Sequence, residues 1–188
     1  MSMTAHGRTV RWHAATALAA AIMATSFSSS TVVAQNDAPP KPGCPGPIHR
    51  QFDFWLGHWD VFAPDGSKAG ENRIEAIAAG CALSESWTGR GGFTGSSLNI
   101  YDKTDGKWHQ TWVDSAGGRL DLAGALEGNA MVLSSSTPNP EKPGALLTQR
   151  ITWTPNTDGS VRQHWQTSED GGKSWSTAFD GKYVKKKP

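Results

Sequence analysis

The stretch that decides the fold is QFDFWLGHWDVF, residues 51–62. Three of its first five residues are aromatic, and a Gly-His-Trp triplet at 57–59 separates them from strand-forming residues at 60–62. A Pro-Asp-Gly turn signal follows at 64–66. We therefore predict a short helical plug of aromatic residues that leads into the first strand of a small antiparallel barrel. A closed barrel of this size can hold one small ligand in its interior.

The rest of the chain continues the β pattern. Short runs with strand character alternate with Gly- and Asp-rich turns, and no long helical period interrupts them. This pattern is typical of a barrel or a sandwich. The predicted strands are 58–63, 69–77, 81–88, 94–102, 107–114, 118–127, 129–135, 146–154, 160–168 and 174–184. Residues 134–144 (SSSTPNPEKPG) form the one long predicted loop, a candidate rim or lid.

The turn at 103–106 sets a predicted hairpin register, because loop length fixes which residues face each other. A four-residue loop there places Asn99 opposite Gln110 and Ser97 opposite Trp112. These side chains then share one face of the sheet.

Two further hairpins give registers of the same kind. A four-residue NTDG loop places Arg150 opposite Trp165. A three-residue loop at 78–80 places Arg73 opposite Glu85. A slip of one residue in either hairpin would exchange the two faces.

The first 34 residues are typical of an export signal. Arg8 and Arg11 precede an uncharged apolar run at 14–24, and small residues offer a cleavage site near Ala34. The apolar run has 11 residues, whereas a membrane-spanning helix needs roughly 20. We therefore predict a cleaved signal at 1–34, a periplasmic or secreted protein, and no stable membrane insertion after cleavage.

The exported part divides into a Pro- and Gly-rich linker at 35–48 and a barrel domain at 49–188. Cys44 and Cys81 are the two cysteines, and an oxidising compartment favours a disulfide between them over free thiols or half a metal site. Without residues 1–34 the chain has 16 Lys and Arg against 17 Asp and Glu, a net charge of −1. This balance predicts no nucleic-acid partner.

Six motifs are similar to those of a family of exported bacterial proteins of unknown function. They are FDFWLG-x-W, NRI, GC-x-L-x-E-x-W, SLN-x-YD, KW-x-Q-x-WVD and RITW, at 52–59, 72–74, 80–87, 97–102, 107–114 and 150–153. The family resembles lipocalin-like, calycin-type barrels, in which a Gly-x-Trp also opens the first strand. The resemblance implies an all-β fold, a single antiparallel barrel of about 8–10 strands, and export; it carries no catalytic residues.

A local resemblance lies at 168–175 (SEDGGKSW), which is similar to the Asp-box pattern S-x-D-x-G-x-[ST]-W. Physically it predicts a hairpin turn in which Ser168 and Asp170 bind turn amides and Trp175 packs back over the turn. One copy gives no indication of a propeller.

Tryptophan is the unusual feature of the composition, with eight residues after position 34. Trp55, Trp59 and Trp175 are interpreted as core. Four others, Trp87, Trp108, Trp112 and Trp165, share predicted faces with amides and a guanidinium. Such a face suits a ligand pocket better than a dry core, although a self-satisfied polar network is the alternative. The candidate ligand-binding residues are Trp87, Asn99, Tyr101, Gln110, Trp112, Arg150 and Trp165.

Two charged residues have competing interpretations. Arg150 could bind a ligand carboxylate through two hydrogen bonds, or it could stack on Trp165 or pair with an acid as a structural residue. Glu85 could be a buried acid with a raised pKa, but the predicted register favours a structural ion pair with Arg73.

Histidines give no metal site, because no pair has ligand spacing within one element. His109 or His164 could in principle bind haem as in nitrobindin-like barrels, but the glycine-rich opening of those proteins is absent, so no cofactor is predicted. The leading hypothesis is a protein that binds a small, partly apolar molecule. The alternatives are an enzyme that uses Glu85 or His109 as acid or base, and a structural or partner-binding domain; the oligomeric state stays open.

Overall fold

The computed structural model describes residues 43–44 and 46–187. The predicted signal at 1–34 and most of the predicted linker lie outside this part. The fold is all-β, as predicted, and the described residues form ten strands and three short 3-10 helices. The helices are η1 Pro47–Arg50, η2 Asp53–Trp55 and η3 Ala78–Gly80. The strands are β1 Gly57–Phe62, β2 Lys68–Ile77, β3 Ala82–Gly89, β4 Thr94–Asp102, β5 Lys107–Asp114, β6 Arg119–Glu127, β7 Ala130–Pro138, β8 Leu146–Pro155, β9 Val161–Ser168 and β10 Ser176–Lys185.

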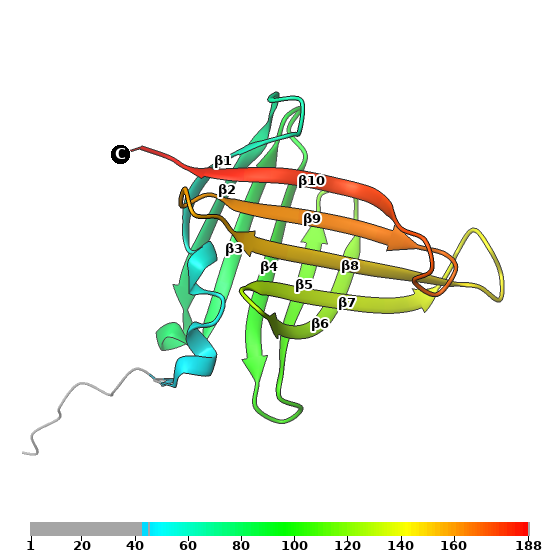
Figure 1. The fold of residues 1–188 in the computed structure, drawn as a ribbon, viewed down its shortest axis with the longest axis horizontal. Coiled ribbons are helices and arrows are strands. Elements are labelled where there is room, and N and C mark those ends of the chain that lie inside the picture. The colour runs from blue at the N-terminus through cyan, green and yellow to red at the C-terminus, as the bar shows by residue number, and fades with distance from the viewer. Residues whose placement is uncertain (1–42, 45, 188) are drawn as a thin grey trace, which may run out of the picture. The chain divides into compact units, whose positions relative to one another are not determined.

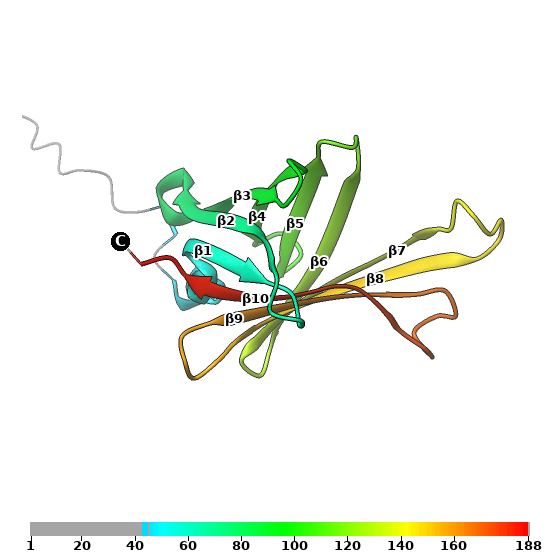
Figure 2. The same ribbon diagram turned by 90° about the horizontal axis from the view of Figure 1, so that it is seen from above.

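Each strand pairs antiparallel with the next along the chain, and β1 pairs with β10 to close the barrel. Figure 1 shows β8, β9 and β10 running across the direction of β3, β4 and β5, so that two layers enclose the interior. The far ends of β7–β10 project beyond the other strands, as the second view shows (Figure 2). The predicted single antiparallel barrel is therefore confirmed.

The register predicted from the turn at 103–106 is confirmed. Asn99 lies opposite Gln110, and Ser97 lies opposite Trp112. All four side chains face inward: the two amides and Ser97 are buried, and Trp112 is half-buried. The alternate residues of β4, such as Leu98, are exposed on the outer face.

The other two predicted registers are wrong by one residue. In β8–β9, Arg150 lies opposite Gln166, because the loop is one residue longer than the predicted four. In β2–β3, Arg73 lies opposite Ser86, since η3 and the residue after it make a four-residue connection. Ala78 and Ala79 adopt positive φ there, a conformation that the sequence pattern does not predict for alanine.

The plug at the start of the domain is confirmed. Phe52 and Trp55 are fully buried, and their rings stack with centroids 5.0 Å apart. Phe52 also meets the rings of Trp108 and Trp153 edge to face. This cluster fills one end of the barrel interior, which we call the closed end. Burial of large rings, with their mutual edge contacts, stabilises this end of the barrel.

A disulfide joins Cys44 to Cys81, as predicted. It ties the chain before η1 to the connection between β2 and β3. The Arg50 guanidinium donates to the Gly80 carbonyl oxygen and links the same two segments. The disulfide fits a protein of an oxidising compartment. Within residues 46–187, no helix has the length and apolar character needed to cross a membrane.

The Asp-box-like segment forms the predicted turn. Asp170 Oδ1 accepts hydrogen bonds from the backbone amides of Lys173 and Ser174, and Oδ2 accepts one from the Ser174 hydroxyl. These bonds, above all that of the Ser174 hydroxyl, lower the pKa of Asp170. Trp175 packs back over the turn and donates to the Gly172 carbonyl. It is half-buried, so its assignment as core is wrong.

The predicted loop at 134–144 is shorter than expected. Its first five residues extend β7 and pair with β8, and the connection that remains is 139–145. The backbone amide of Asn139 donates to the Ala145 carbonyl and closes this connection. None of its residues lines the cavity inside the barrel, so the structure gives no support to its interpretation as a rim or lid.

Candidate functional site

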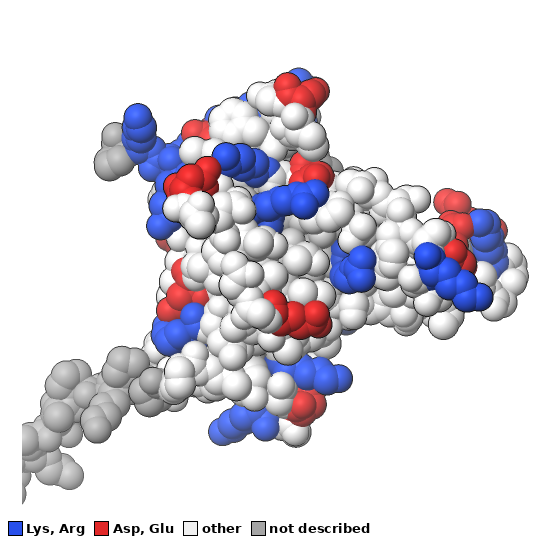
Figure 3. Space-filling view, in the orientation of Figure 1, with Lys and Arg blue, Asp and Glu red and all other residues white. Residues whose placement is uncertain are grey.

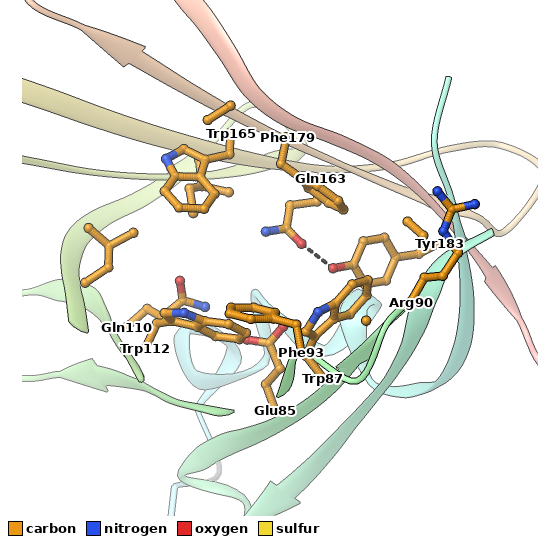
Figure 4. Close-up of a pocket in the computed structure, with 15 residues that line it drawn as sticks. Glu85, Trp87, Arg90, Phe93, Gln110, Trp112, Gln163, Trp165, Phe179 and Tyr183 are labelled. Atoms are coloured by element: carbon orange, nitrogen blue, oxygen red, sulfur yellow. Dashed lines mark hydrogen bonds between the residues drawn. The ribbon is translucent and has the colours of Figure 1, made fainter. Parts of the chain in front are cut away.

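The end of the barrel opposite the plug is hollow. A cavity of about 320 Å³ lies there, near the β3–β4 hairpin. Figure 4 shows Trp87 and Trp112 on one side of it and Trp165 and Phe179 on the other, with space between them. This volume is at the lower end of the range for small-molecule sites, roughly 300–1,000 Å³. Its aromatic lining residues are Trp87, Phe93, Trp112, Trp165, Phe179 and Tyr183.

Two glycines let the tryptophan rings lie flat against the barrel wall. A Cβ atom at Gly95 would stand 2.1 Å from Trp112 Cζ2, and one at Gly70 would stand 2.7 Å from Trp87 Cη2. Such distances are far inside van der Waals contact, so a larger residue at either position would push the ring away from the wall. The glycines therefore keep the interior open on this side.

Glu85 lies at the bottom of the cavity and is 4% exposed. Its Oε1 accepts a hydrogen bond from Asn72 Nδ2 at 2.7 Å, and its Oε2 accepts one from the Ser97 hydroxyl at 2.6 Å. Burial raises the pKa of Glu85, and the bonds from Ser97 and Asn72 oppose this rise. The carboxyl group is thus held in place by neutral donors.

A chain of hydrogen-bonded polar side chains continues from the Glu85 carboxyl along the bottom of the cavity. We call the chain formed by Glu85, Ser97, Asn99 and Gln110 the polar floor. Asn99 Nδ2 donates to Ser97 Oγ at 2.9 Å, and Gln110 Nε2 donates to Asn99 Oδ1 at 2.9 Å. The network fixes each side chain through its neighbour, which makes a buried polar floor stable. Of its members, Glu85 and Gln110 line the cavity.

Tyr183 borders the other side of the floor. Its hydroxyl donates to Gln163 Oε1 and accepts a hydrogen bond from Asn72 Nδ2 at 3.3 Å. Burial, together with the negative charge of Glu85, raises the pKa of Tyr183 well above its usual value. Both Tyr183 and Gln163 face the cavity (Figure 4).

The structure brings four of the seven candidate ligand-binding residues into the cavity: Trp87, Gln110, Trp112 and Trp165. A fifth, Asn99, is fully buried behind Gln110 and supports the floor without lining the space. Tyr101 lies toward the closed end, where its ring meets His49 at 5.4 Å and Trp108 at 6.2 Å. Trp108, grouped with the pocket tryptophans on its predicted face, is instead part of the closed-end core.

Arg150 does not reach the cavity. Its neighbour in β8, Ile151, faces inward, so Arg150 points to the outer side of the sheet. There its guanidinium stacks on the Trp175 ring at 3.9 Å from the centroid and donates to Gln166 Oε1 at 2.9 Å. The predicted contact between Arg150 and a ligand carboxylate is wrong, because the longer β8–β9 loop exchanges the faces.

The predicted ion pair of Glu85 is also absent from the structure. Arg73 points outward and pairs with Glu75, which leaves Glu85 inside with Asn72. His109 lies on the outer face of β5, where its Nε2 is 2.9 Å from Asp105 Oδ2. It does not line the cavity, so it cannot act as acid or base on a molecule bound there.

Sequence reasoning missed Phe93, Gln163, Phe179 and Tyr183, which all line the cavity. For Gln163 the signal was present, since it alternates with Trp165 along β9. For Phe179 it was hidden by a β-bulge between Thr177 and Phe179, which shifts the register of β10 against β9.

One group of side chains in the described part of the chain has the composition of a metal site. Asp102, Asp105 and His109 come together at the β4–β5 turn. Asp102 Oδ1 already accepts the Thr104 amide, and Asp105 Oδ1 accepts the Lys107 amide, so both carboxylates stabilise the turn. The cluster lies outside the cavity.

Charges on the face shown in Figure 3 are mixed, with Lys and Arg side chains scattered among Asp and Glu. No protein-family model matches the chain, and no curated protein matches it.

Proposed function

We propose that the protein is an exported binding protein that holds a small, partly apolar molecule in the open end of its barrel. The observation that carries the proposal is the cavity of about 320 Å³, lined by aromatic rings over a floor of fixed polar side chains. Apolar walls that supply affinity, combined with a few polar groups that orient the ligand, are typical of small-molecule sites.

Export is supported by two independent features. The N-terminal sequence has the charge and apolar pattern of a signal peptide. The Cys44–Cys81 disulfide is of the kind that persists in the periplasm or outside the cell. The motif resemblance to exported lipocalin-like barrels agrees with both.

The experiment is a ligand screen by intrinsic tryptophan fluorescence, with native mass spectrometry to establish a 1:1 complex. Trp112 and Trp165 border the cavity, so a bound molecule should change their emission. Trp165→Ala should weaken binding at least tenfold. Trp175→Ala is the matched control, because Trp175 is a half-buried tryptophan outside the cavity and its loss should leave affinity unchanged.

An enzyme remains the second candidate, on the single observation that a carboxyl group, Glu85, lies inside the cavity. Its raised pKa would suit a general acid. The discriminating result is turnover of a bound compound that Glu85→Gln abolishes while the barrel stays folded. Binding without turnover would support a binding protein.

A further inference from the structure

Glu85 has no cationic partner in the described part of the chain. None of the ion pairs among residues 46–187 includes its carboxylate. Of the described residues that line the cavity, Glu85 is the one acidic side chain and Arg90 the one basic side chain. Arg90 is exposed in the β3–β4 turn, whereas Glu85 is buried at the bottom. The cavity therefore has a carboxyl group at its base to which none of the described residues supplies a counter-charge.

Two neutral donors, Asn72 Nδ2 and the Ser97 hydroxyl, point toward Glu85, and the amides behind them orient the hydroxyl. Asn99 Nδ2 and Gln110 Nε2 donate to Ser97 Oγ at 2.9 and 3.3 Å. Since amide nitrogens only donate, the Ser97 hydroxyl hydrogen is free to point at Glu85 Oε2, and Asn72 Nδ2 donates to the other oxygen. Such an arrangement favours the ionised carboxylate over the neutral acid. Burial acts in the opposite direction and raises the pKa of Glu85.

The walls above Glu85 are also attractive to positive charge. The faces of Trp, Tyr and Phe rings carry negative quadrupole potential and bind ammonium groups within about 6 Å of the ring centroid. Trp87 and Phe179 meet edge to face with centroids 6.1 Å apart, and Trp112 and Trp165 border the space beside them. A cation in this space gains from the rings and from the carboxylate together.

We propose that the ligand is a small cationic molecule, a protonated amine or quaternary ammonium compound with an apolar group, whose positive charge lies against Glu85 and the tryptophan rings. The inference rests on the proposed binding function and narrows it to one chemical class. An anionic ligand would bring its charge to a buried carboxylate, which is strongly unfavourable in a site of low dielectric. A neutral ligand would leave Glu85 without a counter-charge.

The first test compares three probes of nearly equal shape: 2-phenylethylamine, 2-phenylethanol and phenylacetate. Titrations followed by tryptophan fluorescence should show the amine binding at least tenfold more tightly than the alcohol, with the acid weakest. Glu85→Gln should abolish the preference, so that the amine and the alcohol bind with equal affinity. Glu127→Gln is the matched control, because Glu127 is exposed at the end of β6 and away from the cavity.

The second test needs no variant and so does not depend on whether Glu85→Gln folds. Benzyltrimethylammonium keeps its charge at every pH, so a change in its affinity with pH comes from the protein. The affinity should fall as the pH is lowered through the pKa of Glu85, because the neutral acid no longer attracts the cation. Where Glu85→Gln folds, a fluorescence titration of that variant over the same pH range supplies the control.

The outcomes separate the two proposals. Equal affinities for the amine and the alcohol, tighter binding of the acid, or a pH-independent affinity for benzyltrimethylammonium would overturn the cation assignment and leave the binding function standing. Failure of all the probes to bind at millimolar concentration would contradict both.

Discussion

Tryptophan residues lie at both ends of the barrel interior, but they pack into a core at the closed end and line a cavity at the open end. At the closed end, Trp55, Trp108 and Trp153 are at most 1% exposed and pack with Phe52 from the plug. At the open end, Trp112 and Trp165 are half-buried and border empty space. The difference comes from what the chain supplies between the rings: an aromatic plug at one end, and a polar floor with wall glycines at the other.

The largest effect is expected at the closed end. Trp153→Ala removes a fully buried ring from the plug contacts and should lower the free energy of unfolding by about 3–5 kcal/mol. Trp165→Ala at the open end removes a ring that borders solvent-accessible space, and should cost much less. Denaturant unfolding of both variants makes the comparison. Equal losses would contradict the distinction between a packed end and a hollow end.

The next largest effect on stability is expected from loss of the disulfide. Cys81→Ser removes a link across 37 residues of chain, which on the chain-entropy argument lowers stability by about 4 kcal/mol. The link lies before the plug, at the closed end, so the variant that remains folded should keep its ligand affinity. Thermal unfolding and fluorescence titration of the same sample measure the two quantities. Loss of affinity in a folded variant would show that the cavity depends on the attachment of the chain around Cys44.

Gly95→Ala should change both stability and ligand affinity, which the other variants change separately. The added methyl group would occupy the space of the Trp112 ring, 2.1 Å from Cζ2, so the ring must move into the cavity. Overpacking of this kind destabilises by about 1–3 kcal/mol. We expect loss of ligand binding with only this moderate loss of stability. Gly91→Ala, at a turn glycine with nothing within 4 Å, controls for added side-chain volume, although its positive φ gives it a strain of its own.

The polar floor predicts a pH dependence. Burial raises the pKa of Glu85 in the folded state, so the folded protein holds this proton more tightly than the unfolded chain does. The contribution of Glu85 to stability is present below pH 4.5, the ordinary pKa of this group in the unfolded chain. It is lost as the pH rises through the raised pKa that Glu85 has in the folded state. The stability of the ligand-free protein should therefore increase on mild acidification from neutral pH. The increase ends where carboxylates with lowered pKa values, such as Asp158 and Asp170, begin to protonate. Glu85→Gln should flatten this increase in urea unfolding measured between pH 7 and 5; a profile identical to that of the wild type would contradict the assignment.

The smallest effect is expected at Arg150. Its stacking on Trp175 lies on the outer face and is partly exposed, so Arg150→Ala should cost about 0.5–1 kcal/mol of stability. Ligand affinity should not change. A large loss of affinity in this variant would restore the interpretation that Arg150 faces the ligand.

Much of the fold follows from local sequence signals. The turn glycines and the alternation of the strands predict all ten strands to within a few residues, and the aromatic run before Gly57 predicts the plug. The β4–β5 register is correct because a simple four-residue turn sets it, and this register places Asn99 opposite Gln110 and Ser97 opposite Trp112 on one face.

The candidate site was predicted less completely than the fold. A difference of one residue in the length of a turn decides which side chains of the adjoining strands lie opposite each other and face the cavity. In the β8–β9 loop, Ser160 joins the turn through its hydrogen bonds to Asp158, and this extra residue moves Arg150 to the outside. At η3, the positive φ of two alanines moves Glu85 away from Arg73 and into the barrel. Neither detail has a signature in periodicity or residue type.

The central claim is that the open end of the barrel is a ligand site and not a core. The most direct measurement is a crystal structure of the protein purified from the cell that makes it, inspected for density between Trp112 and Trp165. The account predicts ordered non-protein density in contact with these rings and above Glu85. Rings packed against one another, with no space between them, would contradict it.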